Sequence, residues 1–137
     1  MDAFESVAAN KAEPVPEQLQ DLFNHPDDVK VQKLPCALPD EGSMAVHFAA
    51  GVRTVPHTHH HGQHLVIVDG VGVVADDQGV RVVRAGDVVS SPPGGWHWHG
   101  AAPGTAMTYV TVEHPGDFDL AVERRNWDST YEPDLQV

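Results

Sequence analysis

From Ser43 onward the chain is a succession of short runs rich in β-branched residues, and glycine or an acidic turn closes each run. Runs of this length with tight turns between them are typical of antiparallel strands. No useful helix fits between them, which excludes a parallel α/β sheet and predicts an all-β sandwich or barrel. The expected strands are 44–50, 52–55, 64–69, 71–75, 80–84, 88–91 and 105–113.

The residues on either side of this region differ from it in character. Five prolines punctuate the acidic residues 1–42, so we expect an N-terminal arm with at most one short helix, from about residue 16 to residue 24. Residues 43–115 then form the barrel, and residues 116–137, with charges of both signs, form a C-terminal wrap over it. A chain of 137 residues is the usual size of one domain with its own core.

Charge and cysteine content exclude several classes of partner. The formal net charge of −12 repels phosphate backbones and anionic membrane surfaces, so we expect no nucleic acid and no membrane as partners. The lone Cys36 cannot form an internal disulfide, and neither a secretory leader nor a membrane-length apolar run is evident. We therefore expect a cytoplasmic protein.

The most unusual feature of the composition is its histidine content. The chain has ten histidines, and five of them lie between positions 57 and 64. Side chains alternate between the two faces of a strand, so His57 and His59 point the same way and can share one divalent cation. Gln63 returns to the same parity if the register holds across Gly62.

A second pair of histidines follows a Pro-Pro-Gly-Gly turn. His97 and His99 again alternate with other residues and share one face of their strand. Two such pairs on separate strands of one barrel are typical of a site that the scaffold holds rigidly. A metal-free interior would leave these buried polar rings in need of many partners.

The spacing of these residues resembles the paired motifs of the cupin superfamily. The first motif, Gly-x5-His-x-His-x3-(Glu)-x6-Gly, is matched by Gly51, His57, His59, Gln63 and Gly70. The second, Gly-x5-Pro-x-Gly-x2-His-x3-(Asn), is matched by Gly86, Pro92, Gly94 and His97, with Ala101 at the asparagine position. The resemblance covers roughly residues 43–113. It implies the cupin double-stranded β-helix, a jelly-roll barrel.

Within that superfamily the chain is similar to the small manganese- or iron-binding cupins with glutamine at the acidic position. These include bacterial hydroxynitrile lyases and the cupin partners of carboxymuconolactone decarboxylases. The resemblance implies a metal held by His57, His59, Gln63 and His97, with manganese or iron expected and zinc or nickel as further possibilities. His64 is the alternative fourth ligand, but it leaves one residue too few before Gly70.

The implied ligands are all uncharged, so the site keeps the full charge of its dication. Such a site stabilises a developing oxyanion or cyanide and polarises a carbonyl or hydroxyl oxygen. This favours a lyase acting on a small carbonyl or hydroxy compound. An isomerase or cyclase, an iron-dependent dioxygenase and a small-ligand-binding or accessory cupin are the alternatives.

A lyase also needs a group that accepts a proton. Relatives commonly carry histidine on the strand after the second motif, where this chain has Tyr109. A phenol is a poorer base than imidazole but can donate a hydrogen bond. His99 and Glu113 are the other candidates for acid–base roles. Cupins of this size commonly dimerise, and the proline-rich arm is suited to lying across a second copy, so we expect a homodimer that binds a small-molecule substrate.

Overall fold

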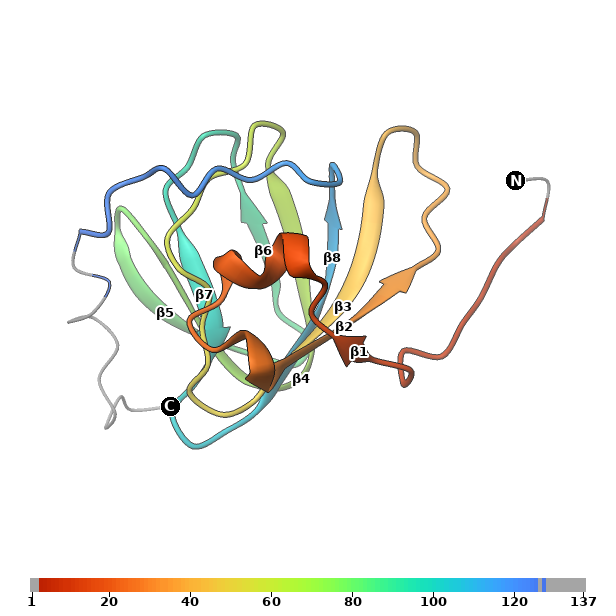
Figure 1. Cartoon of the computed structure of the whole chain (residues 1–137), viewed down its shortest axis with the longest axis horizontal. Coiled ribbons are helices and arrows are strands. Elements are labelled where there is room, and N and C mark those ends of the chain that lie inside the picture. Colours follow the sequence, from red (N-terminus) through yellow and green to blue (C-terminus); the bar gives the residue numbers. More distant parts are fainter. Residues whose placement is uncertain (1–2, 126, 128–137) are drawn as a thin grey trace.

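The computed structural model describes residues 3–125 and 127 and confirms the expected all-β barrel (Figure 1). Its sheet has eight strands, in the order β1-β2-β3-β8-β4-β5, while β6 and β7 pair with β4. The strands are β1 Glu13–Pro14, β2 Val29–Leu34, β3 Gly42–Phe48, β4 Gln63–Asp76, β5 Gly79–Arg84, β6 Val88–Ser91, β7 Trp98–Ala101 and β8 Met107–Glu113. Two short 3-10 helices, η1 Glu17–Leu22 and η2 Pro26–Asp28, precede β2.

Strand β4 organises the barrel because it belongs to both of its layers. Its first half pairs with β6 and β8, and its second half pairs with β5 and β7, all antiparallel. His99 of β7 pairs with Val74 in the second half of β4, and an isolated bridge joins His97 to His57. The two motifs are therefore brought together by strand pairing and not by a flexible loop.

Several of the expected strand boundaries are wrong. The strands expected at 64–69 and 71–75 are one continuous strand, β4, with a β-bulge between Ile67 and Asp69. Gly70 has φ 78°, and a Cβ there would lie 1.9 Å from the carbonyl oxygen of Ala106, so this glycine permits close backbone approach rather than a turn. The strand expected at 52–55 is reduced to isolated bridges of Arg53 and Thr54.

The N-terminal part of the chain contributes directly to the sheet. Strand β2 pairs with β3 along its whole length, although it lies within residues 1–42, which we expected to form an arm. Val29 and Val31 of β2 are buried in the main core cluster. The expected helix is the 3-10 helix η1, which crosses the front of the barrel (Figure 1). The division of the chain at residues 42 and 115 stays a prediction.

The segment after β8 crosses one end of the barrel, where Figure 1 draws it in blue. The last ten residues of the expected C-terminal wrap, 128–137, lie outside the described residues. No helix in the described part of the chain is long and apolar enough to cross a membrane.

Candidate metal centre and cavity

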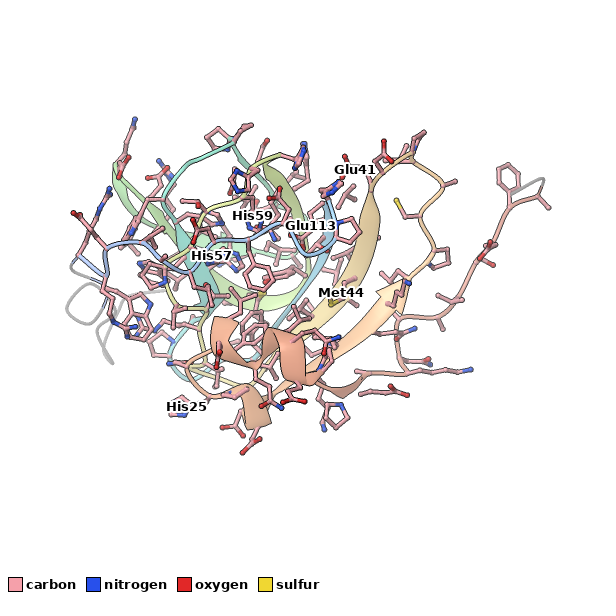
Figure 2. The ribbon with its side chains drawn as sticks, turned by 45° about the horizontal axis from the view of Figure 1, so that its top comes forward. His25, Glu41, Met44, His57, His59 and Glu113 are labelled. Atoms are coloured by element: carbon pink, nitrogen blue, oxygen red, sulfur yellow. The ribbon has the colours of Figure 1, made fainter. Side chains whose placement is uncertain are left out.

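Three histidines of the two motifs converge inside the barrel, and His57 and His59 are visible there in Figure 2. The backbones of His57 and His97 form an isolated antiparallel bridge, with N–H to carbonyl distances of 3.0 and 3.1 Å in the two directions. One ring nitrogen from each of His57, His59 and His97 lies within 4.8 Å of the others, and all three residues are buried. This group could hold a metal ion.

The ring nitrogen Nδ1 of each of these histidines forms a hydrogen bond with a backbone carbonyl oxygen. His57 Nδ1 lies 2.7 Å from the carbonyl oxygen of Val55, and His97 Nδ1 lies 2.8 Å from that of Gly95. A carbonyl oxygen only accepts hydrogen bonds, so each Nδ1 carries the proton and each Nε2 keeps its lone pair. Backbone carbonyls are among the groups that fix the tautomer and the ring orientation of metal-binding histidines.

The other ring nitrogen of each histidine, Nε2, has no hydrogen-bond partner in the described part of the chain. These Nε2 atoms, of His57, His59 and His97, are all buried. Gln63 Oε1 is also buried without a partner among the residues that the structure describes. The amide nitrogen of the same side chain donates to Glu113 Oε2 at 3.3 Å. Buried polar atoms without partners are costly, so four of them in one region indicate that a bound group satisfies them. These donors suit a divalent transition metal.

The structure separates the two candidates for the fourth position. Gln63 is buried at the start of β4, whereas His64 is exposed on the opposite face of the strand. His60 and His61 are also exposed, in the turn between the histidine pair and β4. His64 therefore does not join the histidine group.

Burial keeps the rings of His57 and His97 uncharged. Burial and the neighbouring His97 lower the pKa of His57 well below its usual value. Burial also lowers the pKa of His97 to about 4, despite the bond to Gly95. Neutral imidazole is the form that binds metals, so these rings need not lose a proton at pH 7.

The expected acid–base residues lie beside the histidine group. The Tyr109 hydroxyl on β8 is 3.1 Å from His99 Nδ1, and both side chains are buried. Burial lowers the pKa of His99 and raises the pKa of Tyr109, so the imidazole is neutral and the phenol is protonated. His99 Nε2 has no partner in the described part of the chain. Burial also raises the pKa of Glu113, the residue that holds the Gln63 amide.

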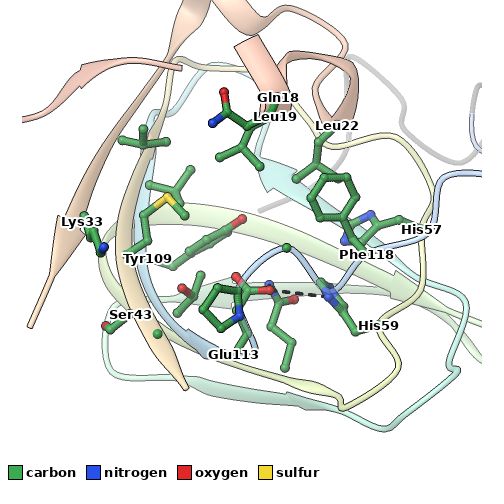
Figure 3. A pocket seen from close by; sticks show the side chains of 18 of the residues that line it. Gln18, Leu19, Leu22, Lys33, Ser43, His57, His59, Tyr109, Glu113 and Phe118 are labelled. Atoms are coloured by element: carbon green, nitrogen blue, oxygen red, sulfur yellow. Dashed lines mark hydrogen bonds and ion pairs between the residues drawn. The ribbon is translucent and has the colours of Figure 1, made fainter. Parts of the chain in front are cut away.

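A cavity of about 430 Å³ opens onto this group (Figure 3). Its volume is within the range of small-molecule sites, about 300–1,000 Å³. His57, His59, Gln63, His99, Tyr109 and Glu113 are among the residues that line it, whereas His97 is not. Its remaining walls are mostly apolar and include Leu19, Leu22, Phe23, Met44, Val46 and Phe118. The cavity therefore combines a cluster of polar side chains with largely apolar walls.

Several of these residues were not predicted from the sequence. Leu19 and Leu22 place η1 against the cavity, but their helical spacing gave no sign of what the helix covers. Asp117 was missed as well. It is buried, and its carboxylate accepts the backbone N–H groups of His60 and His61 at 2.8 and 2.7 Å. Burial raises the pKa of Asp117, but these bonds outweigh that effect and lower it to about 2.

Comparison with known proteins agrees with this geometry. The family described as the cupin domain matches residues 44–113, which contain both histidine motifs. An (R)-mandelonitrile lyase from Granulicella tundricola is 38% identical over 97 residues, which are 70% of this chain and 66% of that protein. The chain thus spans about two thirds of the length of this relative.

Solved structures show the same fold. A cupin-like protein from Thermotoga maritima superposes with a TM-score of 0.62 and 32% identity, over 66% of this chain and 74% of the other. The polyketide cyclase RemF from Streptomyces resistomycificus superposes with a TM-score of 0.71 over 96% of this chain and 95% of the other. At 19% identity the second likeness concerns the fold alone.

Proposed function

We propose, from the premise that this chain belongs to the cupin-domain family, that it is a metal-dependent lyase acting on a small carbonyl or hydroxy compound. The observation that carries the proposal is a set of buried donor atoms without partners among the described residues, of which those of His57, His59 and Gln63 belong to side chains that line a largely apolar cavity. The similarity to an (R)-mandelonitrile lyase supports cleavage and formation of a cyanohydrin as the reaction.

The proposed ligands are Nε2 of His57, His59 and His97, together with Gln63 Oε1. Manganese or iron is the expected metal, and zinc or nickel also suits imidazole ligands. When bound, a divalent cation would supply Lewis-acid polarisation of the substrate oxygen. Because none of the four ligands carries a charge, the protein leaves that polarising charge undiminished.

His99 is the proposed acceptor of the hydroxyl proton. Tyr109 can accept a hydrogen bond from His99 Nδ1, which leaves the Nε2 lone pair free. In cyanohydrin cleavage the proton passes from the hydroxyl to His99 as the bond between the carbinol carbon and the nitrile carbon breaks. Cyanide leaves with the electron pair of that bond and takes up the proton, so the products are an aldehyde and hydrogen cyanide.

Glu113, another polar residue that lines the cavity, has a different role in this proposal. Glu113 accepts the hydrogen bond of the Gln63 amide and so turns Gln63 Oε1 toward the histidines. The apolar walls hold the hydrocarbon part of the substrate and keep water away from the reacting bond.

We predict that Gln63→Ala, which removes a proposed ligand, weakens metal binding by more than the roughly 10- to 100-fold seen when a group that only supports a ligand is removed. Three imidazoles remain, so binding is reduced but not lost. The measurement is the dissociation constant of Mn²⁺ by equilibrium dialysis. His64→Ala is the matched control, because His64 is the adjacent residue on the exposed face of β4. Equal effects of the two substitutions would contradict the assignment of Gln63.

The proposed reaction consumes no oxygen and changes no oxidation state. We therefore predict equal rates of mandelonitrile cleavage in air and under anaerobic conditions, with the purified protein loaded with Mn²⁺. Release of benzaldehyde and cyanide is measured, with the chelator-treated protein as the blank. Activity that requires dioxygen would instead support the dioxygenase alternative, and absence of cleavage would contradict the lyase proposal.

The size of the cavity favours a second candidate. A volume of about 430 Å³ lies within the range of small-molecule sites and leaves room for a substrate larger than a simple cyanohydrin. We therefore keep a cyclase acting on a polyketide intermediate as the alternative. A cyclase would rearrange such a compound without releasing cyanide. A small-ligand-binding or accessory role, a homodimer and a cytoplasmic location stay predictions.

A further inference from the structure

One of the proposed metal ligands depends on a distant part of the chain for its orientation. His57 and His97 each bond to the carbonyl two residues earlier on their own segment. His59 Nδ1 instead bonds to the backbone carbonyl oxygen of Asp117 at 2.5 Å, across 58 positions of sequence. The orientation of the His59 ring therefore depends on where the segment after β8 is held.

The side chain of Asp117 holds that segment in place. Its two carboxylate oxygens accept the backbone N–H groups of His60 and His61, the residues that directly follow His59. The carboxylate is 3% exposed, so these charge-assisted bonds are shielded from water. The carbonyl and the carboxylate of Asp117 thus contact three successive residues, 59–61, which we call the histidine turn.

A second acceptor lies close to the same nitrogen of His59. Glu113 Oε2 is 3.5 Å from His59 Nδ1 (Figure 3). If the carbonyl of Asp117 moves away, the ring can turn toward Glu113, the residue that also holds Gln63. Such a turn would displace His59 Nε2 from the other two histidines.

We infer that Asp117 is a positioning residue for the metal centre, with its carboxylate fixing the carbonyl that orients His59. This inference rests on the proposed metal site. It predicts that the side chain of Asp117, which does not itself reach the ligand ring, controls the affinity of the site. Groups that orient metal-binding histidines in this way change affinity by about 10- to 100-fold.

The test is a Co²⁺ titration of Asp117→Asn in the full chain, followed by the visible absorption of bound Co²⁺. Asparagine keeps the shape of the side chain but replaces one acceptor oxygen by an N–H₂ group facing the His60–His61 backbone. We expect a dissociation constant raised by about 10- to 100-fold and a shifted absorption band. The matched control is Asp119→Asn in the same segment, because its exposed carboxylate bonds only to the N–H of Ala121 among the described residues.

The possible failures can be told apart. An unsubstituted protein that binds no Co²⁺ contradicts the proposed metal site itself. If the unsubstituted protein binds one Co²⁺ and Asp117→Asn binds it with the same dissociation constant, only the positioning role is contradicted. The unfolding temperature of the metal-free proteins is compared in parallel, with Asp117→Ala as a second variant. If neither Asp117 variant folds without metal, the inference is overturned, because the carboxylate would then be needed for the barrel itself.

Discussion

Replacement of His57 by alanine is expected to leave a folded protein that retains almost no metal and almost no activity. His57 is fully buried, and the centre of its ring lies 5.0 Å from that of His59 and 4.3 Å from that of His97. Loss of a group that only supports a ligand already lowers metal affinity by about 10- to 100-fold, so loss of a ligand should exceed that range. Metal analysis of the purified protein and the rate of mandelonitrile cleavage measure both effects.

The matched control for this substitution is His60→Ala. His60 lies in the same turn but is exposed, so its removal should leave metal content and rate unchanged. Unfolding of the metal-free proteins is followed by circular dichroism, which separates loss of metal from loss of the fold. A His57→Ala protein that still holds one metal per chain would show that His57 is not a ligand.

The convergence of the histidines could be predicted because it depends on local geometry. Alternation along a strand places His57 with His59 and His97 with His99, and the turn glycines fix where each segment begins. The same parity placed Gln63 inside and His64 outside, as the structure shows. The short valine-rich runs likewise predicted an all-β barrel, since few other folds bury strands of that length.

Other features depend on contacts between distant segments, which a local pattern does not contain. Gly70 was expected to end a strand. It lies inside β4 instead, where the absence of a side chain lets the carbonyl of Ala106 approach from across the sheet. Asp117 follows a Pro-Gly pair in an unremarkable turn, and nothing near it in the sequence indicates the histidine turn that it contacts. Strand β2 did carry a signal, because Val29 and Val31 alternate with polar residues, but the surrounding prolines favoured an arm.

Replacement of His99 by alanine is expected to lower the rate of mandelonitrile cleavage by about 100- to 10,000-fold, the range typical of a lost acid–base group. Metal content should stay near that of the unsubstituted protein, because the group within 4.8 Å comprises His57, His59 and His97. Tyr109→Phe should cause a smaller loss, since the phenol only fixes the tautomer of the His99 ring. Rate and metal content are measured on the same preparations.

His47→Ala is the matched control, because His47 Nδ1 bonds to the Thr108 hydroxyl at 2.9 Å, one residue before Tyr109. This pair repeats the contact between an imidazole and a hydroxyl on β8 but does not line the cavity. If His99→Ala keeps both metal and rate, another residue must accept the proton, and Glu113→Gln is then the decisive variant. If His99→Ala instead loses its metal, His99 belongs to the ligand set, because the centre of its ring lies 5.2 Å from that of His57 and 5.5 Å from that of His97.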